Sequence, residues 1–238
     1  MATSVHADLI RKKPFLKELY VHYYDEFLHA HESAPPGLRL EIGSGAGFLE
    51  EIVPDVVSFD IRPGADVAAV ASALELPLRA GTVGAIFMLN VLHHLPDIRR
   101  FFIEVGRVLR PGGRAVFIEP YVSPFSRLVY KNFHHEPFNP ESPDWTLEAS
   151  GPMSSANGAL PWIVFVRDRT RFESEFPDLE IRRIEPHTAF LYLLSGGVSM
   201  RSLVPGFAFG TCRAAEGFMG PAIRHAATMM TVEVVCAR

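Results

Sequence analysis

The sequence has few of the features that identify several large classes of protein. It has only 2 cysteines, Cys212 and Cys236, and no CxxC pattern, so we expect neither a disulfide framework nor a cysteine-based zinc site. Lysine occurs only at positions 12, 13, 17 and 131, and the net charge of −4 at pH 7 leaves no basic excess for a nucleic-acid partner. No apolar run approaches the roughly 20 residues of a membrane span. We therefore expect a soluble, cytoplasmic protein without a bound metal.

The composition that remains is that of an ordinary globular chain. Hydrophobic residues make up 48% of the 238 residues and charged residues 21%, which excludes a disordered protein. The composition leaves the oligomeric state open.

Short apolar segments alternate with helical segments through the middle of the chain. Strands are predicted at 38–42, 56–59, 66–70, 83–89 and 114–119, and helices at 48–52 and 97–109, where Asp97 can cap the first turn. This alternation predicts an α/β fold with a mostly parallel sheet.

The remaining segments suggest four regions, at 1–36, 37–122, 123–160 and 161–238. The first is a helical cap, whose Tyr20, Tyr23 and Tyr24 form either a lid over a ligand or one side of a docked amphipathic helix. The second is the core that holds the glycine loop. The third, rich in Pro, Ser, Asn and aromatic residues, reads as an insertion over the carboxyl ends of the strands. The fourth completes the sheet with strands at 179–185 and 229–236.

The strongest local signal is a glycine-rich loop that follows the first predicted strand. Glu41 precedes the run Gly43-Ser44-Gly45-Ala46-Gly47, and Asp60 ends the next strand. Glycines allow a ligand to approach the backbone, and a carboxylate at the end of the second strand can accept hydrogen bonds from ribose hydroxyls. The pattern therefore predicts a nucleoside-containing cofactor.

The spacing and charge of this loop favour one cofactor over another. A dinucleotide fingerprint requires a third small residue where this chain has Phe48, which argues against an NAD(P)-dependent oxidoreductase. The charge of Glu41 suits a cationic ligand better than a pyrophosphate. S-adenosylmethionine (SAM) has an ammonium group for Glu41 and a ribose for Asp60.

Residues 38–120 resemble the core of class I SAM-dependent methyltransferases, in the group called type 11. The motifs that match, in order, are LEIGSGAG (40–47), FD (59–60), ALELP (73–77), NVLHHL (90–95), RVLRPGG (107–113) and FIEP (117–120). The resemblance implies a Rossmann-like, doubly wound sheet of seven strands with a reversed final hairpin. It also implies roles in cofactor binding for Glu41, Gly43, Ser44, Gly45, Gly47, Asp60, Ile61, Ser72, Ala73, Leu74 and Asn90. Two positions depart from the family pattern, because Ser72 and Gly84 stand where many relatives have an acidic residue.

Methyl transfer mainly requires alignment, and a general base is needed only when the acceptor must lose a proton. His134 and His135 in the insertion are the candidates for that base, with a structural or surface role as the alternative. One of His93 and His94 faces the cofactor or the substrate, or else both pack at the junction that follows the fourth strand. Glu119 and Tyr121 are candidate acceptor contacts.

We interpret the chain as a SAM-dependent methyltransferase that acts on a small-molecule acceptor. The apolar stretch 190–209 suggests an apolar or lipid/glycan-linked acceptor and a peripheral membrane contact, or else a core strand with a buried loop. A SAM-binding protein without catalytic activity is the main alternative, and a nicotinamide-dependent oxidoreductase is a weaker one.

Overall fold

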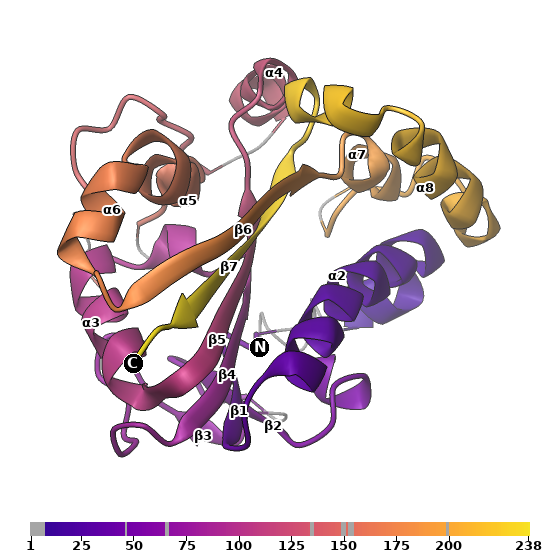
Figure 1. The fold of residues 1–238 in the computed structure, drawn as a ribbon. Helices are drawn as coiled ribbons and strands as arrows, with labels where there is room; N and C mark the ends of the chain where they lie inside the picture. Colours follow the sequence, from indigo (N-terminus) through magenta and orange to yellow (C-terminus); the bar gives the residue numbers. More distant parts are fainter. Residues whose placement is uncertain are drawn as a thin grey trace.

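A computed structural model describes residues 8–45, 47–64, 67–133, 136–148, 151, 155–198 and 200–238. The described residues form a seven-stranded sheet in the order β3-β2-β1-β4-β5-β7-β6 (Figure 1). The strands are β1 (Leu38–Ile42), β2 (Val56–Asp60), β3 (Ala69–Val70), β4 (Val83–Leu89), β5 (Leu109–Pro120), β6 (Leu179–His187) and β7 (Met229–Cys236). Strands β1 to β5 are parallel, and β7 pairs antiparallel with both β5 and β6. The predicted fold, with its reversed final hairpin, is confirmed.

Helices lie on both sides of this sheet (Figure 1). They are α2 (Pro14–Ser33), η1 (Leu49–Glu51), η2 (Leu92–His94), α3 (Ile98–Val108), α4 (Pro124–Phe133), α5 (Leu160–Trp162), η3 (Ile163–Arg167), α6 (Arg169–Glu175), α7 (Leu191–Ser195), η4 (Gly206–Ala208), α8 (Phe209–Gly217) and η5 (Gly220–His225). Within the described ranges, no helix combines the length and apolarity needed to cross a bilayer.

Each face of the sheet has its own hydrophobic core. On one face, Phe102 of α3 lies edge-on to Phe172 of α6 with ring centroids 4.9 Å apart. On the other face, Phe27 of α2 packs on Phe87 of β4 at 5.2 Å. Strand β4 is apolar throughout because both of its faces are covered. At the start of α3, the Asp97 carboxylate accepts the backbone N–H of Arg100, as expected for an N-cap.

Two predicted elements are shorter than expected. The helix at 48–52 is a single 3₁₀ turn, η1, because Pro54 disfavours helical backbone at Val53 and has no N–H to donate. The described part of the third strand is only Ala69–Val70, and Asp66 lies outside the described residues.

The glycine at position 84 has a structural explanation. A Cβ on Gly84 would lie 2.4 Å from the carbonyl oxygen of Pro35 and would overlap the guanidinium of Arg39. Arg39 donates to the carbonyl oxygens of Pro35 and Gly37 at 2.9 and 3.0 Å. The side chain of Arg39 thus occupies the space beside Gly84 and ties the entry of β1 to the segment before it.

The described part of the insertion packs against the carboxyl side of β4. Trp145 is fully buried and donates from its indole nitrogen to Asp168 at 2.9 Å. The backbone N–H of Asn157 donates to the carbonyl of His93 at 3.0 Å. The bond from Asn157 holds the segment around it over the turn that follows β4, and the bond from Trp145 ties the insertion to the start of α6.

Candidate active site

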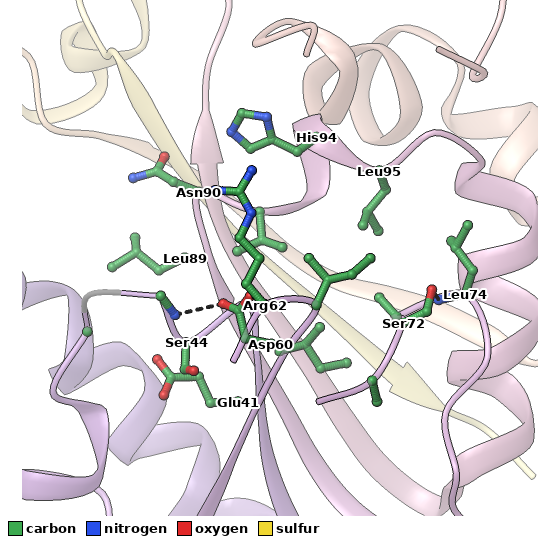
Figure 2. Close-up of a pocket in the computed structure, with 18 of the residues that line it drawn as sticks. Glu41, Ser44, Asp60, Arg62, Ser72, Leu74, Leu89, Asn90, His94 and Leu95 are labelled. Atoms are coloured by element: carbon green, nitrogen blue, oxygen red, sulfur yellow. Dashed lines mark hydrogen bonds between the residues drawn. The ribbon is translucent and has the colours of Figure 1, made fainter. Parts of the chain in front are cut away.

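A cavity of about 610 Å³ opens at the carboxyl ends of β1, β2 and β4 (Figure 2). It is lined by all eleven residues that the sequence predicts to bind the cofactor, namely Glu41, Gly43, Ser44, Gly45, Gly47, Asp60, Ile61, Ser72, Ala73, Leu74 and Asn90. They meet there because parallel strands end at the same edge of a sheet.

The glycine loop forms the floor of the cavity on the side of β1. Gly43 and Gly45 have φ angles of +73° and +49°, in the left-handed region that favours glycine. A Cβ on Gly43 would lie 2.5 Å from the side chain of Val91, so this position has no room for a larger residue. The hydroxyl of Ser44 is buried and has no hydrogen-bond partner among the described residues. The loop therefore brings bare backbone to the cavity, and the Ser44 hydroxyl lies buried within it.

Glu41 is a buried carboxyl group on the cavity wall. The residue is only 6% exposed, and none of its described neighbours donates a hydrogen bond to its carboxyl group. Burial, with the charges of Glu50 and Asp60 nearby, raises the pKa of Glu41 to about 8. A cation bound beside this carboxyl would favour its ionised form.

Asp60 is oriented by the backbone on both sides of it. One carboxylate oxygen accepts the N–H of Gly45 at 3.0 Å, and the other accepts the N–H of Arg62 at 2.8 Å. A carboxylate has about four acceptor positions, so each oxygen keeps capacity for another donor. These two bonds fix the side chain at the end of β2 with its remaining acceptor sites available.

The far wall of the cavity is mostly apolar. Leu74 lies there beside Ser72, whose hydroxyl accepts the backbone N–H of Leu74 at 3.2 Å. Ile61 and Ala73 also line the cavity. This combination suits a flat, largely apolar ring with a few polar edges.

The cavity also includes residues that the prediction of cofactor contacts did not include. Tyr20 and Tyr24 of α2 line it, and the Tyr24 hydroxyl accepts the N–H of Phe48 at 3.3 Å. Tyr23 instead lies against Thr188 and His187. The two interpretations of the cap are therefore both partly right, because α2 is docked on the core and also closes one side of the cavity. Helical spacing alone could have indicated that Tyr20 and Tyr24 share a face.

A second polar cluster lies at the end of β4 and β5. His93 Nδ1 is 2.6 Å from Glu119 Oε2, and its Nε2 is 3.4 Å from Glu136 Oε2. Burial disfavours the imidazolium, but the charge and hydrogen bond of Glu119, together with Glu136, raise the pKa of His93 to about 9. His93 is thus part of a polar cluster rather than of apolar packing alone.

His94 connects this cluster to the cavity. It lines the cavity, where Figure 2 shows it on the opposite side from Glu41, and its ring lies 4.2 Å from that of His93. Burial and the charge of His93 lower the pKa of His94. Tyr121 is half-buried and does not line the cavity. The candidate bases His134 and His135 lie outside the described residues.

Comparison with known families gives a match over the central part of the chain. Residues 40–117 match the family described as "Methyltransferase domain". This range contains the glycine loop, Asp60, Ser72 and the His93–His94 pair.

Comparison with curated proteins gives matches of similar extent. A probable S-adenosylmethionine-dependent methyltransferase of Mycolicibacterium smegmatis is 33% identical over 115 residues, which cover 42% of this chain and 43% of that protein. A malonyl-[acyl-carrier protein] O-methyltransferase of Hahella chejuensis is 28% identical over 105 residues, 37% of each chain. The chain thus spans less than half the length of these relatives.

Solved structures resemble the whole fold. Geranyl diphosphate C-methyltransferase from Streptomyces coelicolor, in complex with Mg²⁺, geranyl diphosphate and S-adenosyl-L-homocysteine, has a TM-score of 0.58 at 18% identity, covering 99% of this chain and 84% of that one. A geranyl diphosphate methyltransferase in complex with SAM has a TM-score of 0.56 at 16% identity, covering 99% and 91%. At these identities the likeness concerns the fold.

Proposed function

We propose that this chain is a class I SAM-dependent methyltransferase that transfers a methyl group from SAM to a small-molecule acceptor. The observation that carries the proposal is the convergence of Glu41, Asp60 and the glycine loop on one cavity. Bound SAM would supply an electrophilic methyl group on a sulfonium. The protein's own contribution would be to bind, align and exclude water.

The residues around the cavity fit the parts of SAM. Glu41, whose carboxyl has no hydrogen-bond donor among the described residues, would receive the ammonium group, and the Asp60 carboxylate would accept the ribose hydroxyls. Side chains at Gly43 and Gly47 would collide with Val91 and with the Tyr24 hydroxyl, so the loop meets the cavity as bare backbone. The buried Ser44 hydroxyl has no partner among the described residues. Ile61, Ala73 and Leu74 would flank the adenine.

Two variants at opposite ends of β2 test whether Asp60 binds the ribose. Asp60→Asn removes the charge at the carboxyl end of β2, and Asp55→Asn removes a charge from an exposed residue just before its amino end. A hydrogen bond to a charged group contributes about 1.5–3 kcal/mol. We therefore expect Asp60→Asn to weaken SAM binding at least about tenfold in calorimetry, and Asp55→Asn to leave it unchanged.

The same calorimetry separates the competing functions. Binding of NAD without binding of SAM would reject the proposal. Tight SAM binding, followed by no transfer of labelled methyl groups to any component of metabolite or lipid extracts, would favour the SAM-binding protein without catalytic activity.

We propose further that the acceptor is apolar or lipid-linked and that the protein meets it at a membrane surface. Support comes from three exposed apolar residues in the segment that contains η4 and α8, because Phe207, Phe218 and Leu203 are 91%, 92% and 73% exposed. Three exposed arginines lie in the same segment, at positions 201, 213 and 224. Exposed aromatic residues beside arginines suit an anionic lipid surface. Helix α2, which lines the cavity, packs against η4 and α8.

Vesicle sedimentation tests this contact. We expect the protein to pellet with vesicles that contain phosphatidylglycerol more than with pure phosphatidylcholine, and Phe207→Ser/Phe218→Ser to abolish the difference. Ile103→Ser changes an apolar residue that is 62% exposed on α3 and serves as the matched control. Equal sedimentation of the wild type and the double variant would contradict the contact.

A further inference from the structure

The histidine cluster beside the cavity has the composition of a metal site. We propose that His93, His94 and Glu136 bind a divalent transition-metal ion of the Zn²⁺ type. Each offers one ligand atom, and the three atoms lie within 4.8 Å of one another. His93 Nε2 and His94 Nε2 are 3.4 and 3.7 Å from the two carboxylate oxygens of Glu136. Ligands about 2.0–2.1 Å from a tetrahedral Zn²⁺ are themselves roughly 3.3 Å apart, so small side-chain rotations suffice.

An outer carboxylate provides an independent reason for the assignment. Histidines that bind metals usually donate their second ring N–H to a carboxylate, which fixes the tautomer and aims the other nitrogen at the metal. His93 has this arrangement, since its Nδ1 lies 2.6 Å from Glu119 Oε2. The other oxygen of Glu119 accepts the N–H groups of Val91 and Leu92 at 2.8 and 2.7 Å. Glu119, which is fully buried, is therefore a positioning residue that holds His93 with Nε2 directed toward Glu136.

The donor set indicates the class of metal. Two imidazoles and one carboxylate suit Zn²⁺, Fe²⁺ or Mn²⁺, whereas Mg²⁺ and Ca²⁺ prefer oxygen ligands throughout. Three protein ligands leave at least one coordination position for another molecule. Because His94 also lines the cavity, that molecule would be an oxygen-bearing acceptor or water. This last role rests on the proposed function, whereas metal binding itself does not.

Metal binding is best tested with the full-length protein after treatment with EDTA. Titration with Co²⁺, followed by its visible absorption, and with Zn²⁺, followed by calorimetry, should give one saturable ion per chain. His94→Ala and Glu136→Gln should each lower the affinity at least tenfold. His225→Ala removes an exposed histidine on η5 and should leave the affinity unchanged.

A separate measurement tests whether Glu119 positions His93 for metal binding. Glu119→Gln should lower Co²⁺ affinity about 10- to 100-fold and shift the absorption of any remaining complex. A merely structural role for Glu119 would not move that spectrum.

Three results would overturn the proposal. They are the absence of saturable Co²⁺ and Zn²⁺ binding, unchanged binding in both His94→Ala and Glu136→Gln, or preference for Mg²⁺ over Zn²⁺. The first would mean that the cluster is only a network of ion pairs. SAM calorimetry on the same wild-type sample keeps the two proposals separate, because metal binding without SAM binding refutes only the proposed function.

Discussion

Glu41 and Glu119 are two buried glutamates at the carboxyl ends of β1 and β5, the two strands on either side of β4. Glu119 accepts two backbone N–H groups and contacts His93, so its carboxylate has partners within the protein. Glu41 has no such partner among the described residues, and burial raises its pKa to about 8. A buried charge persists in the folded state only when it is paired. The contrast therefore separates a carboxylate that supports the structure from one that is available for a ligand.

The largest expected effect is on stability, at Glu119. Glu119→Ala leaves His93 and the N–H groups of Val91 and Leu92 without their acceptor, and breaking a buried pair costs about 3–5 kcal/mol. Urea unfolding should show a loss of this size in the free energy of unfolding. Glu141→Ala, at an exposed site, should change it by less than about 0.5 kcal/mol. A loss below about 1 kcal/mol at Glu119 would remove the distinction between the two glutamates.

The second effect is on ligand affinity, at Glu41. Glu41→Gln removes the charge that would pair with the ammonium of SAM, a bond of about 1.5–3 kcal/mol. Calorimetry at pH 8 should show SAM binding weakened roughly 10- to 100-fold, while the unfolding free energy of the unliganded protein does not fall. Reduced stability with unchanged SAM affinity would make Glu41 a structural residue like Glu119.

The raised pKa of Glu41 predicts a dependence on pH. Below about pH 8 the free protein holds a proton on Glu41 that the ammonium must displace, so SAM affinity should rise up to about tenfold per pH unit between pH 6 and 8. The stability of the unliganded protein should change with pH in the opposite direction. Because the pKa of Glu41 is higher in the folded state than in the unfolded state, its contribution to the free energy of unfolding falls as pH rises from about 4.5 to 8.

Both slopes should be measured in wild type and in Glu41→Gln. We expect the variant to lack both contributions, since glutamine does not titrate. A variant that keeps the rise of affinity with pH would assign the proton to another group.

The smallest effect is expected at Ser44, near Glu41. Its buried hydroxyl has no partner among the described residues, so Ser44→Ala should leave thermal stability unchanged or raise it by up to about 1 kcal/mol. If the hydroxyl binds SAM, the same change should weaken binding by up to about tenfold in calorimetry. Lower stability with unaltered affinity would show that the hydroxyl has a partner in the unliganded protein.

Much of the fold and of the cavity could be predicted from local sequence. The run from Glu41 to Gly47 and the apolar segment of β4 are contiguous, and parallel strands necessarily bring their carboxyl ends together. That geometric rule is why eleven residues from separate motifs line one cavity.

The features that sequence did not predict depend on contacts between distant segments. His93 and Glu119 are 26 residues apart, and Glu136 comes from the insertion, so nothing local indicates that the three meet. Similarly, Arg39 and the carbonyl oxygen of Pro35 occupy the space beside Gly84, a contact between segments that are distant in the sequence. The length of η1 depends on a single proline, which outweighs the helical pattern around it.

Val91 contacts both the glycine loop and the carboxylate of Glu119. Its side chain fills the space that a Cβ on Gly43 would need, and its N–H is held by Glu119. A shift of the glycine loop on cofactor binding would therefore be transmitted through one residue to the carboxylate that orients His93. Such a connection would couple the occupancy of the cofactor cavity to that of the proposed metal site and, by thermodynamic reciprocity, each ligand would alter the dissociation constant of the other by the same factor.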